Sequence, residues 1–159
     1  MRQASLPLAL AVLLVAACSN AQPSTFAATS ASVDASYFCP GGANNARYDL
    51  HGTVDVRNGT AHAVTIQSIS AEMTLVAVRG AWLEKLGDRY DAGDATFSPK
   101  SVGPTSSARL GIVISSACTS DRYESGGSSR GDYSVTMRLA TSAGTYSVTA
   151  QNHHQIVAA

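Results

Sequence analysis

Three cysteines are the residues whose types and positions say most about the chemistry of this sequence. Cys18 closes an apolar N-terminal run, whereas Cys39 and Cys118 lie 79 positions apart in the remainder. Redox-active and zinc-binding cysteines usually come in closely spaced pairs, and that spacing does not occur here. If Cys18 is modified separately, the other two make an even number. We therefore expect Cys39 and Cys118 to form a structural disulfide in an oxidising compartment.

An acidic stretch in the middle of the chain contains candidate calcium ligands. Asp88, Asp91 and Asp94 recur at every third position. An EF-hand needs oxygen ligands at positions 1, 3 and 5 and a glutamate at position 12, where counting from Asp88 reaches Pro99. Two interpretations remain, an irregular calcium site and a solvated acidic loop. We expect no metal and no cofactor, and keep these aspartates as weak candidates.

The four histidines are also weak candidates for a divalent metal site. His51 and His62 lie near a predicted hairpin, across which they would approach each other. His153 and His154 are adjacent, so on a strand they would point to opposite faces and could not easily share one ion. We favour the alternative that the histidines are exposed polar side chains.

Motifs for catalysis are weak in this sequence. Serine is frequent, but we expect no Gly-x-Ser-x-Gly nucleophile elbow. No glycine-rich phosphate loop stands between a predicted strand and a predicted helix. The tripeptide Arg130-Gly131-Asp132, which some adhesins present to animal cells, is short enough to occur by chance. We expect a protein that is not an enzyme.

The N-terminus has the three parts of a secretory signal. Residues 1–3 carry positive charge, residues 6–17 are apolar apart from Pro7, and small residues precede Cys18. A helix of this length spans about 18 Å, whereas the hydrocarbon core of a bilayer is about 30 Å thick. The run is therefore too short for a permanent transmembrane helix.

The tetrapeptide Val-Ala-Ala-Cys at positions 15–18 resembles the lipobox of bacterial lipoproteins. The resemblance implies cleavage after Ala17 and acylation of Cys18, and two acyl chains hold a protein stably on a membrane. It also implies a place in the cell envelope. Ser19 stands where an inner-membrane signal would usually have aspartate, so we expect the outer membrane in a cell that has one. The alternative is ordinary cleavage, after Ala17 or Ala21, and a freely secreted protein.

Composition predicts one small, nearly neutral domain behind this signal. The 159 residues include 11 basic and 11 acidic side chains, and only 14% are charged. Nucleic-acid binding is not expected, because it needs clustered lysine and arginine. The sequence predicts a cleaved signal peptide at 1–17, a flexible Ser/Ala/Thr-rich tether at 18–32 and a folded domain at 33–159.

Alternation of apolar and polar residues predicts antiparallel strands in this domain. Every second residue from Tyr48 to Val56 lies on the apolar face, and Asn58-Gly59 is the strongest short signal for a hairpin turn. The apolar phase then shifts by one residue after Ser68, which predicts a bulge or a break.

Further patterns complete the fold prediction. Residues 110–118 alternate, and 133–139 and 146–150 predict a hairpin. Apolar spacing within 82–86 favours one helical turn under the core. Six or seven strands without a long helix predict an immunoglobulin-like antiparallel β-sandwich, and the disulfide would tie its first strand to the end of the strand at 110–118.

These features lead to one functional hypothesis and one alternative. We expect an envelope lipoprotein, anchored to the membrane through Cys18, whose domain has a non-enzymatic binding or structural role. Its partner would be another envelope protein or a surface component. The alternative is a periplasmic ligand- or metal-binding module that uses the aspartate or histidine candidates.

Overall fold

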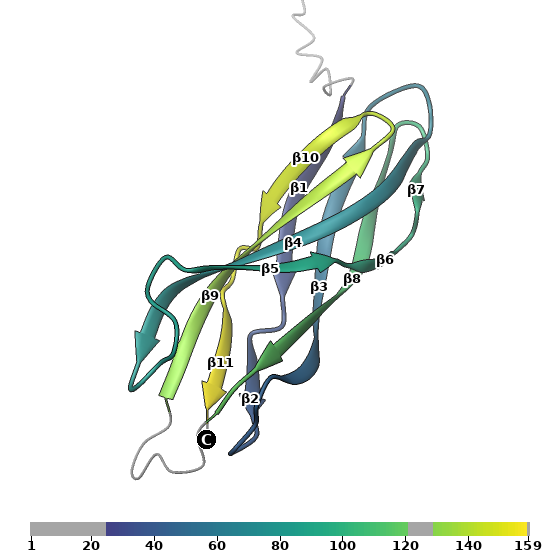
Figure 1. Cartoon of the computed structure of the whole chain (residues 1–159). Coiled ribbons are helices and arrows are strands. Elements are labelled where there is room, and N and C mark those ends of the chain that lie inside the picture. Colours follow the sequence, from purple (N-terminus) through teal and green to yellow (C-terminus); the bar gives the residue numbers. More distant parts are fainter. Residues whose placement is uncertain (1–24, 121–128, 159) are drawn as a thin grey trace, which may run out of the picture.

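Every regular element in the described part of the chain is a β-strand. The computed structural model describes residues 25–120 and 129–158. Its strands are β1 (Phe26–Val33), β2 (Ser36–Cys39), β3 (Ala46–Asn58), β4 (Val64–Arg79), β5 (Arg89–Asp94), β6 (Thr96–Ser98), β7 (Ser101–Val102), β8 (Ser106–Cys118), β9 (Ser129–Thr141), β10 (Gly144–Thr149) and β11 (His154–Ala158). They form two facing sheets (Figure 1), which confirms the predicted immunoglobulin-like sandwich.

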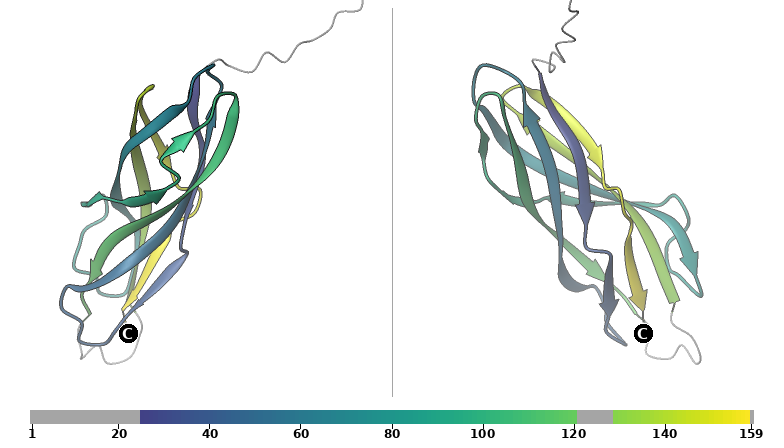
Figure 2. Two further views of the ribbon diagram at one scale, coloured as in Figure 1. Left: turned by 90° about the vertical axis from the view of Figure 1, so that its right-hand side faces the viewer. Right: turned by 180° about the vertical axis from the view of Figure 1, so that it is seen from behind.

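The two sheets differ in their number of strands and in the order of these strands. The first has the strand order β1-β3-β8-β6, and the second has β2-β11-β9-β4-β5, with β10 beside β9 and β7 beside β4. All these pairs are antiparallel except the parallel pair of β2 and β11. The turned views in Figure 2 show the strands as two elongated layers.

Apolar side chains alternate into the space between the layers as the sequence predicts. Leu50 on β3 and Ile114 on β8 are opposite each other in register, and both are fully buried. The β9–β10 hairpin also forms as predicted. On β4 the register shifts between Ile66 and Ser68, so the change of apolar phase is a β-bulge within one continuous strand.

The chain changes sheet several times, and two of these changes, from β1 to β2 and from β5 to β6, form corners on opposite sides of the sandwich. After β1 the Asp34 amide donates to His51 on β3, and the next residue, Ala35, accepts from Gln155 on β11. After β5, which pairs with β4, Ala95 donates to Ile69 and the chain continues into β6, which pairs with β8.

A gap remains on the side of the second corner. On the edge of β8 away from β3, β6 covers only Gly111–Val113, and the described chain places no strand along the rest of that edge toward Cys118. Strand β5 belongs to the other sheet and lies across this region (Figure 1). The sandwich is therefore open between β5 and the C-terminal half of β8.

The Asn58-Gly59 hairpin prediction is wrong. Strand β3 pairs with β1 and β8, whereas β4 pairs with β9, so the two strands belong to different sheets. The Asn58 side chain is completely buried, and its amide donates to the carbonyl oxygens of His62, Val102 and Gly103. Asn58 therefore ties together the connections at this end of the sandwich.

Two further predictions need correction. The predicted tether at 18–32 overlaps β1, which pairs with β3 from Phe26 onward, because a strand in this position can bury Phe26 and Ala31. The helical turn predicted within 82–86 does not form. Leu83 and Leu86 are 74% and 62% exposed, and the chain there is a loop between β4 and β5.

The disulfide between Cys39 and Cys118 is present, as predicted. It ties the second strand, rather than the first, to the end of β8, because β1 precedes β2 in the structure. Both cysteines are buried, so the bond cross-links the two sheets inside the open end of the sandwich.

Candidate functional site

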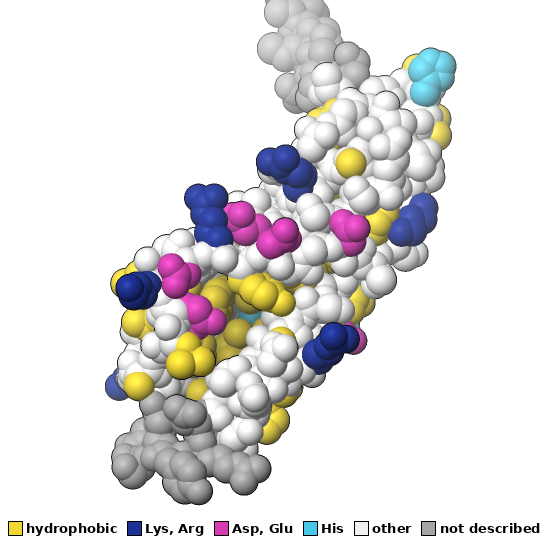
Figure 3. Space-filling model, in the orientation of Figure 1, with side chains coloured by type: hydrophobic (Ala, Val, Ile, Leu, Met, Phe, Trp, Pro, Cys, Tyr) yellow, Lys and Arg dark blue, Asp and Glu magenta, His cyan; other side chains and the backbone are white. Residues whose placement is uncertain are grey.

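A pocket of about 260 Å³ lies between the sheets at the open end of the sandwich. The residues that line it come from the β4–β5 loop, β5, β8, β9, β11 and the segment before β3, and they are Asn45, Ala81, Trp82, Leu83, Glu84, Tyr90, Ala117, Cys118, Thr119, Ser120, Ser129, Tyr133, Ile156 and Ala158. Hydrophobic side chains gather in this hollow beneath β5, and acidic side chains lie along its margin (Figure 3).

Trp82 forms one wall of the pocket because a glycine on β9 leaves room for it. Gly131 occupies an inward-facing position of β9, and a Cβ atom there would lie 2.5 Å from Cε2 of Trp82. Gly80 starts the loop with φ 77°, in the left-handed region that favours glycine. A Cβ at Gly80 would also lie 2.5 Å from the Oγ of Ser129. Two glycines thus allow the β4–β5 loop to fold back over the open end.

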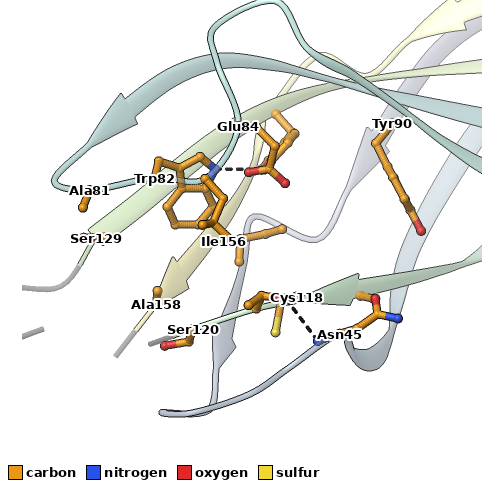
Figure 4. A pocket seen from close by; sticks show the side chains of 14 residues that line it. Asn45, Ala81, Trp82, Glu84, Tyr90, Cys118, Ser120, Ser129, Ile156 and Ala158 are labelled. Carbon is orange, nitrogen blue, oxygen red and sulfur yellow. Dashed lines mark hydrogen bonds between the residues drawn. The ribbon is translucent and has the colours of Figure 1, made fainter. Parts of the chain in front are cut away.

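A hydrogen-bond chain connects Trp82, Tyr133 and Glu84 on this wall (Figure 4). The indole Nε1 donates to the Tyr133 hydroxyl at 3.1 Å, and this hydroxyl donates to Oε2 of Glu84 at 3.3 Å. Burial raises the pKa of Tyr133 above its usual value, so the phenol keeps its proton and its role as donor. The chain fixes the position of a carboxylate beside two aromatic rings.

The rim of the pocket exposes large apolar groups to solvent. Leu83 is 74% exposed and Tyr90 is 46% exposed. Tyr90 projects from β5 on the side of the pocket away from Trp82 (Figure 4), and the buried Cys118 and Ile156 lie deeper. The site therefore has a hydrophobic interior and a hydrophobic mouth.

A shallower groove adjoins the pocket along the uncovered edge of β8. It is lined by Asn45, Arg47, Tyr48, Asp49, Tyr90, Ala92, Ser115, Ser116 and Ala117, of which Asn45, Tyr90 and Ala117 also line the pocket. Successive side chains of a strand point to opposite faces, so a single face would contribute only every second residue. Three consecutive residues of β3 and three of β8 line this groove, so both faces of these two strands contribute to it.

A second polar network lies between the sheets near the pocket. Tyr37 stacks on Tyr48 with ring centroids 3.9 Å apart, and the Tyr48 hydroxyl lies 2.9 Å from Nε2 of His154. Nδ1 of His154 lies 2.7 Å from the backbone oxygen of Asp34, which can only accept. Nδ1 therefore carries the hydrogen, and Nε2 accepts from Tyr48.

Burial shifts the titration of both partners in this network. It raises the pKa of Tyr48 to about 12 and lowers the pKa of His154, because desolvation disfavours the charged form of each group. The prediction that the histidines are exposed is wrong for His154, which is 1% exposed, whereas its neighbour His153 is exposed. Alternation along β11, which also buries Ile156, is the pattern that would have identified it.

The structure does not bring the three candidate aspartates together as a metal site. Within 25–120 and 129–158, no group of three or more His, Cys, Asp or Glu side chains could hold a metal ion. Asp88 accepts from the Lys85 amide at 2.8 Å and Asp91 accepts from the Gly93 amide at 2.9 Å, so both carboxylates stabilise local turns. Asp94 is exposed at the end of β5.

The structure shows the surroundings of the remaining candidate residues, except for Cys18. His51 hydrogen-bonds to Asp34, and it does not face His62 across a hairpin, because that hairpin does not form. The tripeptide at 130–132 belongs to β9, where Asp132 accepts from the Gln155 side chain. Cys18 lies outside the described residues.

The letters of residues 127–131 match Gly-x-Ser-x-Gly, but the described part does not form a nucleophile elbow. Ser129 begins β9, and a strand rather than a helix follows it. His154 makes its hydrogen bonds with Tyr48 and the Asp34 backbone. The described residues therefore show no serine activated by this buried histidine.

Comparison with known proteins gives a limited result. No family model matches the chain, and no curated protein matches it. Among solved structures, PapD-like domain 7 of human CEP192 aligns with 98% of this chain and 96% of its own, with 14% identity and a TM-score of 0.32. A putative late embryogenesis abundant protein aligns with 80% of this chain and 69% of its own, with 19% identity and a TM-score of 0.43. Similarity this low carries no information about function.

The described residues include no helix that is long and apolar enough to span a membrane.

Proposed function

We propose that this chain is a lipid-anchored protein of the cell envelope whose sandwich binds another molecule in the pocket at its open end, without catalysing a reaction. The observation that carries the proposal is the pocket itself. Ligand sites are concave and mostly apolar, with a few polar groups that fix orientation. The wall formed by Trp82, Tyr133 and Ile156 is aromatic and aliphatic, and the Glu84 carboxylate is held beside it.

The exposed rim supports a binding role. A leucine that is 74% exposed and a tyrosine that is 46% exposed stand at the mouth of a cavity lined by both apolar and polar groups. Covering such groups contributes about 25 cal/mol for each Å² of apolar surface removed from water. A ligand that enters the pocket and contacts Leu83 and Tyr90 would gain this contribution.

The location of the pocket is compatible with an anchor at Cys18. Seven residues lie between Cys18 and Phe26, a reach of at most about 28 Å. Phe26 lies opposite Asn58, whereas Cys118 lies opposite Ala46, so about 40 Å of β3 separates the start of β1 from the pocket. The ends of β8 and β11, which line the pocket, thus lie at the opposite end of the domain from the start of β1 (Figure 1).

Trp82 provides a direct test, because it is the single tryptophan of the chain and lines the pocket. We expect hexan-1-ol, a small apolar probe, to change the Trp82 emission in a saturable manner. Replacing Leu83 with serine should weaken this binding by about fivefold, since a rim contact is lost. An emission that does not change up to the solubility limit of the probe would contradict the proposal.

A matched variant separates rim contacts from general effects of the loop. Leu86 is 62% exposed on the same loop but does not line the pocket. The Leu86→Ser variant should therefore bind hexan-1-ol as the unmodified chain does. Equal weakening in both variants would show that the probe does not occupy this pocket.

A further inference from the structure

The described lining of the pocket carries negative charge and no positive charge. Among the described residues that line it, Glu84 is the one charged side chain, and neither lysine nor arginine contributes. The other polar groups are hydroxyls and the Asn45 amide, which carry no net charge. A ligand in this pocket therefore meets a negative group that no basic side chain in the described lining balances.

Three aromatic side chains surround the same space. Trp82 comes from the β4–β5 loop, Tyr90 from β5 and Tyr133 from β9, and all three line the pocket. Trp82 and Tyr90 lie on different sides of it (Figure 4). Aromatic rings carry negative charge on their faces and attract cations within about 6 Å, and tryptophan does so most strongly.

The exposed Glu84 carboxylate is oriented by a hydrogen bond before any ligand arrives. Glu84 accepts from the Tyr133 hydroxyl, and this hydroxyl accepts from Trp82, so one chain orders the charge and two of the rings. The turn that follows Glu84 is closed by Asp88, whose carboxylate accepts from the Lys85 amide. The loop is also tied to β4, because the Leu75 amide donates to the Asp88 carbonyl and the Gly87 amide donates to the Leu75 carbonyl.

From these observations we infer that the pocket binds an organic cation, an ammonium or guanidinium group carried on an apolar body. This inference rests on the proposed function, since it names the ligand class of the same site. The rings of Trp82, Tyr90 and Tyr133 pack against the apolar groups around the charged nitrogen. The Glu84 carboxylate neutralises the charge of the cation. Ile156 and Leu83 contact the apolar body.

This chemistry has two natural sources, which a titration distinguishes. A quaternary ammonium group occurs in small molecules and in lipid headgroups, for which choline is the probe. A primary ammonium group on an alkyl chain occurs in proteins, for which Nα-acetyl-lysine amide is the probe. Tighter binding of choline would indicate the first source, and tighter binding of the lysine derivative would indicate the second.

The decisive comparison uses a neutral molecule of the same shape. In 3,3-dimethylbutan-1-ol a carbon replaces the nitrogen of choline, so only the charge differs. We expect the full chain to bind choline, the lysine derivative or both at least tenfold more tightly than this alcohol, as measured by Trp82 emission. Equal binding of the charged and neutral molecules would overturn the inference and leave the proposed function intact. Failure of all these probes and of hexan-1-ol would overturn both.

Substitution of Glu84 tests the role of its charge directly. Glu84→Gln keeps the shape and an oxygen that accepts from Tyr133, and because Glu84 is exposed the substitution leaves the core unchanged. Affinity for the cations should fall about tenfold, whereas affinity for the neutral alcohol should stay the same. Glu72→Gln, on β4 outside the pocket lining, is the matched control and should change neither. Cation binding that is equal in both variants would also overturn the inference.

Discussion

The Tyr48 hydroxyl donates a 2.9 Å hydrogen bond to Nε2 of His154, across a sequence separation of 106 residues and between the two sheets of the sandwich. His154 is 1% exposed, and its other nitrogen donates to the Asp34 backbone oxygen. With the imidazole neutral, Nδ1 donates and Nε2 accepts, so both ring nitrogens and the Tyr48 hydroxyl hydrogen are paired. Protonation at Nε2 would remove the acceptor that Tyr48 needs.

This relationship predicts that acid destabilises the fold. Burial lowers the pKa of His154 in the native state, so below about pH 6.5 the unfolded chain takes up a proton that the native state resists. Stability should be complete above pH 6.5 and should fall as the pH drops toward the native pKa. Urea unfolding of the unmodified chain at pH 7 and pH 5 measures the loss.

Two histidine variants assign the effect to one residue. His154→Gln should cost about 1–3 kcal/mol at pH 7, because buried hydrogen-bond partners lose their contacts, and should unfold with less dependence on pH. The exposed His153→Gln should retain both the stability and the pH dependence of the unmodified chain. An acid response that persists undiminished in His154→Gln would contradict the prediction.

Loss of the Cys39–Cys118 disulfide should destabilise the domain strongly. The bond closes a loop of 79 residues, which corresponds to about 4.5 kcal/mol on the chain-entropy model. The double variant Cys39→Ala/Cys118→Ala should therefore unfold at a much lower urea concentration. Cys18→Ser, which leaves the bond in place, is the control and should unfold as before. A midpoint unchanged by removal of the bond would disagree with the structure.

Filling the space at Gly131 should displace Trp82 from the pocket wall. The added Cβ of Gly131→Ala would lie 2.5 Å from the indole, too close for both to keep their positions. We expect Trp82 emission to shift to longer wavelength and stability to fall by about 1–3 kcal/mol. Gly111→Ala is the control, since its nearest neighbour is the Ser98 oxygen at 4.0 Å. Identical emission spectra of the two variants would contradict the described packing.

Acylation at Cys18 is the basis of the proposed anchor. In a bacterial host, the unmodified chain should fractionate with membranes, and its mature N-terminal peptide should carry the mass of at least two acyl chains. Cys18→Ser should move the protein into the soluble fraction while leaving its fold unchanged. An unmodified N-terminal peptide in the mature protein would rule out the anchor.

The strands were predictable because their pattern is local. Alternation over residues 110–114 and 133–139 reports which face is buried, and the structure buries those side chains. The disulfide was predictable because Cys39 and Cys118 make an even number once Cys18 is expected to be modified separately. The destination of the chain after the Asn58-Gly59 turn was not predictable. The residues that favour a turn are the same whether the next strand pairs in the same sheet or enters the facing one.

The pocket was less accessible to sequence reasoning. Trp82 enters the interior from a loop, and its apolar spacing resembles that of a helix. One signal was present, since Gly131 is a small residue at an inward position of a strand with otherwise larger inward residues, so another segment has to fill the space. No local pattern indicates Glu84, whose position depends on a hydrogen bond with Tyr133, 49 residues away.

The position of β11 between β2 and β9 determines when folding can finish. Strand β2 has no other neighbour in its sheet, so its backbone stays unpaired until His154–Ala158 have been synthesised. The same residues supply the acceptor for Tyr48 and the Ile156 wall of the pocket. Pairing between segments so distant in sequence is slow. A nascent chain therefore exposes this end of the sandwich to chaperones and proteases until β11 is added.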